Sequence, residues 1–156
     1  MEKVEWKNDY CIGVEEIDVQ HRKLLSIVNE FYDVAVGHPA DYPIKVGRCL
    51  KKLTDYTHYH FEAEEMLMER YQFPSTAQHK SEHDNFIKQV TTKIPQIASG
   101  NQVMGQELYQ FLLDWIVNHI AHSDKSWADY VITIQQSPEE MNRMYRRPGG
   151  IPFFSK

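Results

Sequence analysis

Apolar residues recur at steps of three and four along most of this chain, which is the spacing of one face of an α-helix. The pattern predicts four long helices, over residues 18–36, 41–70, 76–98 and 105–134. Short segments rich in glycine, proline and serine separate them. Four long helices joined by short connections predict an all-α fold, an up-down-up-down four-helix bundle.

Local signals refine the helix ends. Asp18 and Ser75 can serve as N-caps of the first and third helices. Pro43 suits the first turn of the second helix, because a helix's first residues need no backbone donor. Pro95 lies in the last turns of the third helix and should kink or end it. The first seventeen residues show no helical period, so we expect an extended N-terminal arm.

The apolar periodicity of the four long helices does not continue after Gln135. Ser137 and Pro138 are a helix-start signal, and a short fifth helix is expected over residues 139–145. A turn at residues 146–150 and an apolar end at 151–154 follow, and we expect this end to fold back on the bundle. The predicted organisation is a four-helix domain over residues 1–136 and a C-terminal extension over 137–156.

Composition excludes several classes of protein. With 42% hydrophobic and 25% charged residues the chain has an ordinary globular balance, and its net charge of -5 argues against nucleic-acid binding. No apolar run is long enough to insert into a membrane. The N-terminus is charged and lacks the apolar stretch of a secretory signal, so a cytoplasmic location is expected. Cys11 and Cys49 are then expected to be reduced, structural thiols.

Histidine is the unusual residue, with eight in 156 positions. Side chains that commonly bind metals occur once or twice in each predicted helix. Many of them fall in the apolar phase of their helix, where a buried imidazole needs a hydrogen bond or a metal and a buried carboxylate needs a compensating cation. The candidate ligands are His21 in the first helix, His60 and Glu64 in the second, His79 and His83 in the third, and His119 and Asp124 in the fourth.

The spacing of these residues suggests how they act. Residues four apart share a helix face, so His60 with Glu64 and His79 with His83 can each present two ligands in one direction. His119 and Asp124 are five apart and would diverge on a regular helix. Either a π-bulge distorts the helix there or the two side chains reach different ions. This irregularity favours a site shared between two metals.

The number of donor atoms indicates the type of metal site. Five histidines, two bridging carboxylates and one bridging oxygen fill all but one position of two six-coordinate ions. The remaining position is where a small diatomic could bind. Imidazole with carboxylate suits iron, although the residue types do not exclude manganese or zinc.

The order and spacing of these motifs resemble the hemerythrin family. The carrying segments are residues 13–21 (GVEEIDVQH), 60–65 (HFEAEE), 79–83 (HKSEH) and 115–125 (WIVNHIAHSDK), and the resemblance spans about residues 6–130. A single His-x-x-x-His is a weak signal, whereas the four segments together are specific.

The resemblance implies a cofactor of two iron ions bridged by an oxo or hydroxo group. It implies that His79, His83 and His119 bind one iron and that His21 and His60 bind the other, with Glu64 and Asp124 bridging both. The open position would be on the iron bound by two histidines. An apolar wall would line the oxygen pocket and exclude water, and its expected residues are Phe61, Trp115, Ile116 and Ile120.

The remaining polar residues are expected to have ordinary roles. His38 is interpreted as a solvated or capping residue at a helix end, and His58 should face away from His60. His122 could approach the edge of the site without binding metal, and Glu65 should face solvent. Other large side chains are expected in core or rim packing: Tyr56, Tyr59, Met66, Met68 and Trp127.

The leading functional prediction is reversible dioxygen binding for storage, delivery or sensing, by a protein that is not an enzyme. A di-iron redox enzyme, acting as peroxidase, oxidase or in nitric-oxide handling, is the alternative. Iron storage fits poorly, because a closed site holds only two ions. Dioxygen is the expected ligand, and an oxygen-consuming enzyme is a possible recipient. A sensing role would need a separate partner, since no signalling segment is recognisable in this chain. The oligomeric state stays open, with a monomer favoured.

Overall fold

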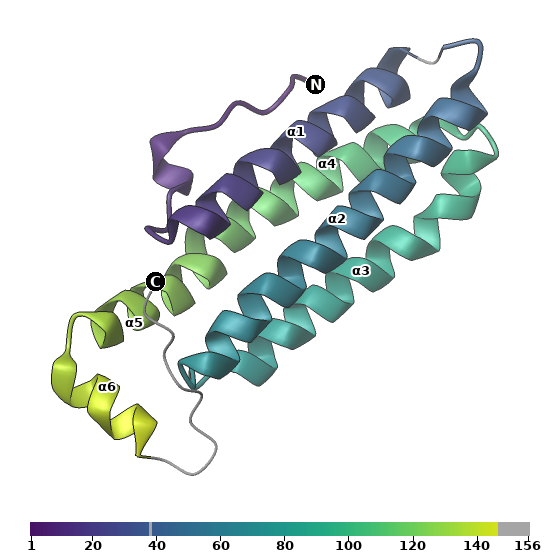
Figure 1. Ribbon diagram of the computed structural model, residues 1–156. Coiled ribbons are helices and arrows are strands. Elements are labelled where there is room, and N and C mark those ends of the chain that lie inside the picture. Colours follow the sequence, from purple (N-terminus) through teal and green to yellow (C-terminus); the bar gives the residue numbers. More distant parts are fainter. Residues whose placement is uncertain (38, 147–156) are drawn as a thin grey trace.

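Four long helical segments lie side by side and alternate in direction in the computed structural model of the protein (Figure 1), which describes residues 1–37 and 39–146. The expected all-α, up-down-up-down bundle is confirmed, and the described residues contain no strand. In chain order the elements are a short 3₁₀ helix η1 (Asn8–Tyr10), α1 (Glu15–Gly37), α2 (Tyr42–Arg70), α3 (Thr76–Ala98), α4 (Gln102–Asn118), a π-helix η2 (His119–Asp124), α5 (Lys125–Gln135) and α6 (Pro138–Tyr145).

The start of α1 differs from the prediction. The helix begins at Glu15, so Asp18 lies inside its first turn and is not the N-cap. Its buried carboxylate instead accepts the backbone N–H groups of Ile12 (2.8 Å) and Gly13 (3.2 Å). Gly13 has a φ of +90°, a conformation that glycine adopts without strain. These two hydrogen bonds to Asp18 therefore hold the N-terminal arm against the helix that carries His21.

The other helix ends follow simple local rules. Pro43 lies in the first turn of α2, as predicted. Ser75 precedes α3, but its side chain makes no capping hydrogen bond. The third helix ends at Ala98, within one turn of Pro95. The fourth begins earlier than expected, because the Asn101 side chain accepts the N–H of Met104 at 3.0 Å and caps α4.

The fourth long segment is one continuous helical run made of α4, η2 and α5. Its middle, His119–Asp124, is a π-helix. A π-helix bonds each residue to the fifth one along, so it aligns side chains five positions apart. Of the two explanations for the His119 and Asp124 spacing, the helix distortion is the one observed, and it turns both side chains toward the interior.

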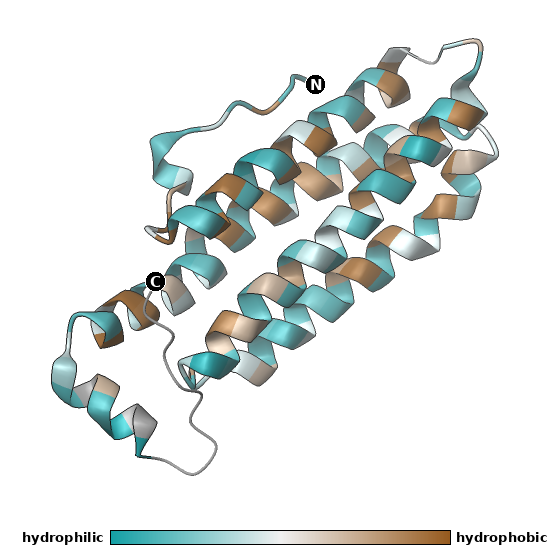
Figure 2. Ribbon diagram, viewed as in Figure 1, coloured by the Kyte–Doolittle hydropathy of each residue, from teal (hydrophilic) through white to brown (hydrophobic). Residues whose placement is uncertain are grey.

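Apolar side chains of the four segments form a continuous core, and Figure 2 shows hydrophobic positions in brown recurring along these segments among hydrophilic ones in teal. Met68 and Trp127 are buried in that core as expected, whereas Tyr59 and Met66 are exposed. The N-terminal arm lies along the bundle, where Tyr109 donates a hydrogen bond to the carbonyl oxygen of Glu2 at 2.6 Å.

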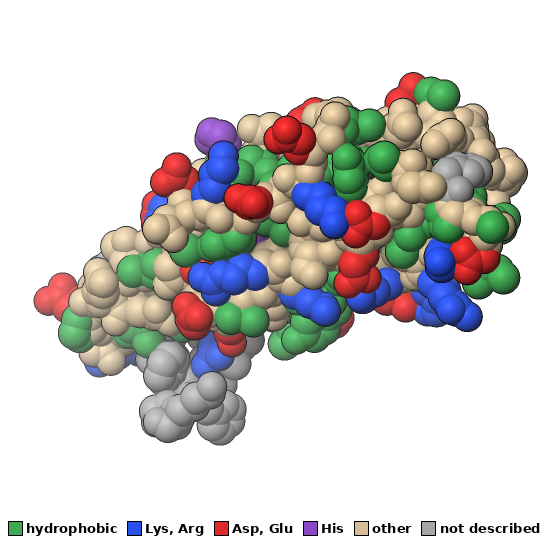
Figure 3. All heavy atoms as spheres, turned by 90° about the horizontal axis from the view of Figure 1, so that it is seen from above, with side chains coloured by type: hydrophobic (Ala, Val, Ile, Leu, Met, Phe, Trp, Pro, Cys, Tyr) green, Lys and Arg blue, Asp and Glu red, His purple; other side chains and the backbone are tan. Residues whose placement is uncertain are grey.

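The surface carries a mixture of side-chain types. Figure 3 shows acidic, basic and apolar side chains interspersed on one face, with histidine almost absent from it. Within the described residues, every helix is too short or too polar to serve as a membrane-spanning segment. Cys11 and Cys49 are half-buried free thiols. The short helix α6 is confirmed, whereas His38 and the expected apolar end at 151–154 lie outside the described residues.

Candidate metal centre

The seven predicted ligands meet in the core of the bundle, although they come from four different helical segments. All seven are buried, with exposed fractions between 0% and 6%. Their ligand-type atoms fall into two groups that share Glu64 and Asp124, and within each group these atoms lie within 4.8 Å of one another. We call the first the three-histidine group, with His79, His83 and His119, and the second the two-histidine group, with His21 and His60.

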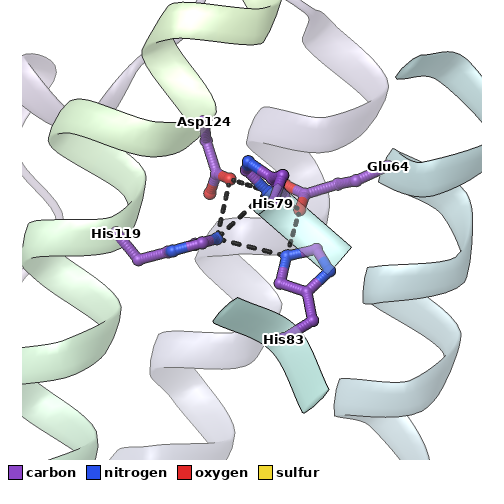
Figure 4. Close-up of side chains that lie close together, drawn as sticks. All are labelled: Glu64, His79, His83, His119 and Asp124. Carbon is purple, nitrogen blue, oxygen red and sulfur yellow. Dashed lines mark hydrogen bonds and ion pairs between the residues drawn. The ribbon is translucent and has the colours of Figure 1, made fainter. Parts of the chain in front are cut away.

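In the three-histidine group the ring nitrogens point at one another and at both carboxylates (Figure 4). The Nε2 atom of His119 lies 3.1 Å from that of His83 and 3.2 Å from that of His79. Asp124 Oδ1 is 3.1 Å from Nε2 of both His79 and His119. Glu64 Oε2 is 3.2 Å from Nε2 of His83.

The two-histidine group uses the other side of the same carboxylates. The Nε2 atom of His21 lies 3.2 Å from Glu64 Oε1 and 3.2 Å from Asp124 Oδ2. His60 Nε2 is 3.3 Å from Glu64 Oε1. Each carboxylate thus offers one oxygen to each group, which is the arrangement of a ligand that bridges two ions.

The donor set fits metal ions better than a network of hydrogen bonds. Glu64 Oε2 and both carboxylate oxygens of Asp124 are buried without a hydrogen-bond partner among the described residues. Such unsatisfied groups are costly in a protein interior. The Nε2 atom of His119 lies within hydrogen-bond distance of the Nε2 atoms of both His79 and His83, and these three nitrogens cannot all be satisfied by one another, since a neutral ring has only one donor nitrogen. Cations between these atoms would satisfy all of them.

Electrostatics show how strongly the two carboxylates act on the histidines. Burial alone would lower the pKa of His21 and of His79, but the carboxylates of Asp124 and Glu64, which lie within ion-pair distance of their Nε2 atoms, raise each pKa to about 9. Burial would raise the pKa of Glu64, yet the charge of His60 and hydrogen bonds from neighbouring histidines hold it well below its usual range. The pKa of Asp124 is lowered in the same way, against burial and the charge of Glu64. Without a cation, protons take its place.

Three of the ligand rings are held from behind by a side chain of the preceding helix. Gln20 Oε1 of α1 accepts from Nδ1 of His60 in α2 at 2.9 Å. Glu65 Oε1 of α2 is 2.9 Å from Nδ1 of His83 in α3. Glu82 Oε2 of α3 is 3.1 Å from Nδ1 of His119 in η2. We call Gln20, Glu65 and Glu82 the outer partners.

The outer partners fix the tautomer of the rings they contact. A carboxylate and an amide oxygen only accept hydrogen bonds, so each Nδ1 atom must carry the proton. The lone pair is then on Nε2, which faces the centre of the site. His21 has no outer partner, because its Nδ1 atom is buried without a hydrogen-bond partner among the described residues.

Sequence reasoning missed these partners, and for Glu65 it was wrong. Glu65 is only 22% exposed and faces His83, because α3 packs against the side of α2 that carries it. A signal was present: each outer partner is adjacent in sequence to a ligand. Adjacency does not show which ligand each outer partner contacts, because that ligand lies on the next helix and not beside it in the sequence.

Aromatic rings cover the histidines. Phe61 stacks on His83 with ring centroids 3.7 Å apart and also lies 5.8 Å from the ring of His60, so it touches both groups. Trp115 stacks on His119 at 4.1 Å, in the three-histidine group. Ile116 and Ile120 are buried in the same segment. The sequence predicted these four residues as the wall of an oxygen pocket, and that role stays a prediction.

Two surface grooves approach the three-histidine group between α3 and the fourth segment. One, of about 560 Å³, is lined by Trp115, His119 and Asp114, and the other, of about 290 Å³, reaches His79. Both contain Glu82 and His122. His122 is exposed and its Nδ1 atom bonds the carbonyl oxygen of Asn118, so it lies at the edge of the site as expected. His58 is also exposed.

Comparisons with known proteins agree with this geometry. The pattern described as the Hemerythrin HHE cation binding domain matches residues 12–131. The chain is 35% identical to a bacteriohemerythrin of Stenotrophomonas maltophilia, over 81% of this chain and 80% of that one, and 33% identical to a bacteriohemerythrin of Pseudomonas aeruginosa, over 87% and 84%. The crystal structure of wild-type hemerythrin superimposes with a TM-score of 0.72 at 27% identity, covering 83% of this chain and 98% of that one.

Proposed function

Because this chain belongs to the hemerythrin family, whose members are di-iron proteins that bind oxygen, we propose that it binds dioxygen reversibly and acts in oxygen storage, delivery or sensing rather than in catalysis. The observation that carries the proposal is the pair of ligand groups joined by two shared carboxylates, Glu64 and Asp124. A site of this kind holds two ions close together, as two-electron chemistry on a diatomic requires.

We assign one iron ion to each ligand group. The three-histidine group would supply three imidazoles to one ion and the two-histidine group two to the other, and Glu64 and Asp124 would be ligands of both. The inequality of the two groups supports an open position on the second ion, because it has one protein ligand fewer. Iron suits the mixture of imidazole and carboxylate donors. When bound, iron(II) supplies the electrons that oxygen binding needs.

The chain's own residues would make such binding reversible. The outer partners keep the Nε2 lone pairs of three rings directed inward. Phe61, Ile116 and Ile120, each at most 5% exposed, exclude water from the centre. Exclusion of water slows proton transfer to the site and therefore slows irreversible oxidation. Trp115 shields the His119 ring on the groove side.

The test is an oxygen cycle followed by visible absorption. The iron-loaded protein is reduced without air, exposed to oxygen and then returned to an oxygen-free atmosphere. We expect an absorption band that appears with oxygen and disappears when oxygen is withdrawn. Protein loaded with zinc, which has no redox chemistry, should show no band. Direct conversion to a stable ferric spectrum without a reversible phase would overturn the proposal and would favour the redox-enzyme alternative, which turnover with peroxide or nitric oxide would then establish.

A matched pair of variants ties the result to the assigned site. His60→Ala removes a proposed ligand of the ion with the open position, and we expect it to lose the oxygen-dependent band. His58→Ala removes an exposed histidine two residues away on the same helix and should behave as the unaltered protein. Equal behaviour of the two variants would show that the assignment to the two-histidine group is wrong.

A further inference from the structure

We propose that a groove between α1 and α2 is the docking site of an acidic electron-transfer protein that returns the oxidised centre to its ferrous form. The groove has a volume of about 510 Å³ and lies between Lys23–Ile27 of α1 and Arg48–Tyr59 of α2. We call it the α1/α2 groove. The proposal rests on the proposed function, because only a ferrous centre binds oxygen reversibly.

The rim of the α1/α2 groove is basic although the chain as a whole carries a net charge of -5. The lining contains four cationic side chains, Lys23, Arg48, Lys51 and Lys52, and one carboxylate, Asp55. Lys51 and Lys52 are paired with Asp55 and Glu30, but Lys23 and Arg48 have no ion pair within the described residues. Uncompensated positive charge on an acidic protein selects an acidic partner and steers its approach.

The floor of the groove has the composition of a protein-binding site. Ile27 is buried at its base, and Tyr56 and Tyr59 form its aromatic wall, with Tyr59 57% exposed. Tyrosine and arginine are enriched among residues that dominate binding at protein interfaces. From Arg48 to Tyr59 the groove follows roughly 17 Å of helix at the usual rise per residue. That length suits a protein surface better than a single small anion.

A polar connection runs from this groove to the two-histidine group. Tyr56 donates a hydrogen bond to the carbonyl oxygen of Gln20 at 3.4 Å, and the Gln20 side chain accepts from the His60 ring at 2.9 Å. Tyr59 directly precedes His60 in the chain. A carrier docked against Tyr56 is therefore linked to the His60 ring through two hydrogen bonds and the covalent atoms of Gln20.

A docking site is needed because the centre itself is inaccessible. All seven proposed ligands are at most 6% exposed, so a large reductant cannot touch them. The grooves that reach His119 and His79 contain Glu82, and one also contains Asp114, which would repel an acidic carrier. Charge therefore directs the carrier to the α1/α2 side. Each encounter oxidises one carrier by one electron and reduces one ferric ion to ferrous, so two encounters restore the pair.

The experiment uses the full iron-loaded chain and an acidic flavodoxin as the probe. Calorimetric titration with oxidised flavodoxin measures docking, and stopped-flow oxidation of reduced flavodoxin by the ferric protein measures transfer. We expect a Kd that rises with ionic strength. Lys23→Glu/Arg48→Glu should weaken docking roughly tenfold or more and slow the transfer in parallel. Lys88→Glu/Lys93→Glu on α3 makes the same change of net charge outside the groove and should have little effect.

Three results would overturn the proposal. Equal loss of affinity in both double variants would mean that only net charge matters. Free flavin mononucleotide that binds as tightly as flavodoxin would make the groove a small-anion site. Self-association that disappears in Lys23→Glu/Arg48→Glu on sedimentation would make a second copy of this chain the occupant. Docking does not require oxygen binding, so a failed oxygen cycle with intact docking removes the proposed function alone, whereas the reverse outcome removes this inference alone.

Discussion

In the three-histidine group, His83 and His119 each donate their Nδ1 proton to a glutamate, Glu65 and Glu82. In the two-histidine group, His60 donates to the neutral amide of Gln20, and the Nδ1 atom of His21 has no partner among the described residues. A carboxylate partner makes an imidazole a stronger donor to a metal ion. The three-histidine group therefore has both more ligands and more basic ones.

With this asymmetry, one site can hold an ion firmly and still react. The three-histidine group is organised to retain its ion, with carboxylates behind two of its rings. The two-histidine group has weaker support and one ligand fewer, which suits the ion that exchanges a diatomic ligand. The surface repeats the contrast: acidic side chains line the grooves near the first group, and basic ones line the α1/α2 groove near the second.

The largest effect is expected where the two groups share a ligand. Glu64→Gln keeps the size of the side chain but removes a charge that both groups contact. We expect the variant to lose both ions, because neither group retains enough anionic donors to offset the burial of a dication. Elemental analysis of iron per chain measures the loss, with circular dichroism to verify that the helices form. Glu62→Gln, an exposed change on the same helix, should load iron normally. Full iron content in Glu64→Gln would refute the shared role.

Removal of metal should expose a pH dependence common to both groups. The pKa values of His21 and His79 are raised to about 9 from an ordinary value of 6.5, so their interactions stabilise the fold fully below pH 6.5 and are lost as pH rises through about 9. The pKa values of Glu64 and Asp124 are lowered, so their contribution is lost toward acid. The chelated protein should be most stable slightly below neutral pH.

We expect an alkaline loss of about 3 kcal/mol, the free energy that one shift of this size represents, because His21 and His79 share the same two carboxylates and their losses do not add. Urea unfolding of the chelated protein between pH 6 and pH 9.5 measures it. Iron-loaded protein is the control and should show a much flatter profile, because cations replace those protons. A chelated protein whose unfolding midpoint does not fall above pH 7 would contradict the charge balance described for the centre.

A smaller effect should separate the two groups. Glu82→Ala removes the carboxylate behind His119, and Gln20→Ala removes the amide behind His60. Loss of such a partner typically weakens metal affinity by about 10- to 100-fold. We expect Glu82→Ala to release an ion more readily than Gln20→Ala, since a charge-assisted bond is the stronger one. Competition with a chelator measures both. If Gln20→Ala loses iron first, the assigned order of support is wrong.

The smallest effect is expected at the edge of the site. His122 is exposed and bonds a backbone carbonyl of its own helix, so His122→Ala should leave iron content and the oxygen cycle unchanged. Its proximity to His119 in the chain makes it the sharpest control for the ligand assignment. A measurable loss of iron in this variant would mean that the grooves beside the three-histidine group contribute to metal binding or entry.

Helical periodicity was sufficient to predict the bundle and the clustering of the seven residues. Apolar periodicity defines the inner face of each helix, and ligand-type side chains four apart on that face must point the same way. The five-residue step from His119 to Asp124 indicated an irregular helix for the same reason. Local periodicity is a property of one segment, so it can be derived without knowledge of the other segments.

The outer partners of the ligand rings could be identified only from the packing of the helices. The positions of Gln20, Glu65 and Glu82 on their helices predict side chains that face solvent or a boundary between helices. Their oxygen atoms accept hydrogen bonds from ligand rings only because the neighbouring helix places a ring against them. The role of Asp18 was decided in the same way, by the path of the arm above α1. Contacts between helices depend on the rotation and offset of each pair, and no repeat within a single helix encodes those two quantities.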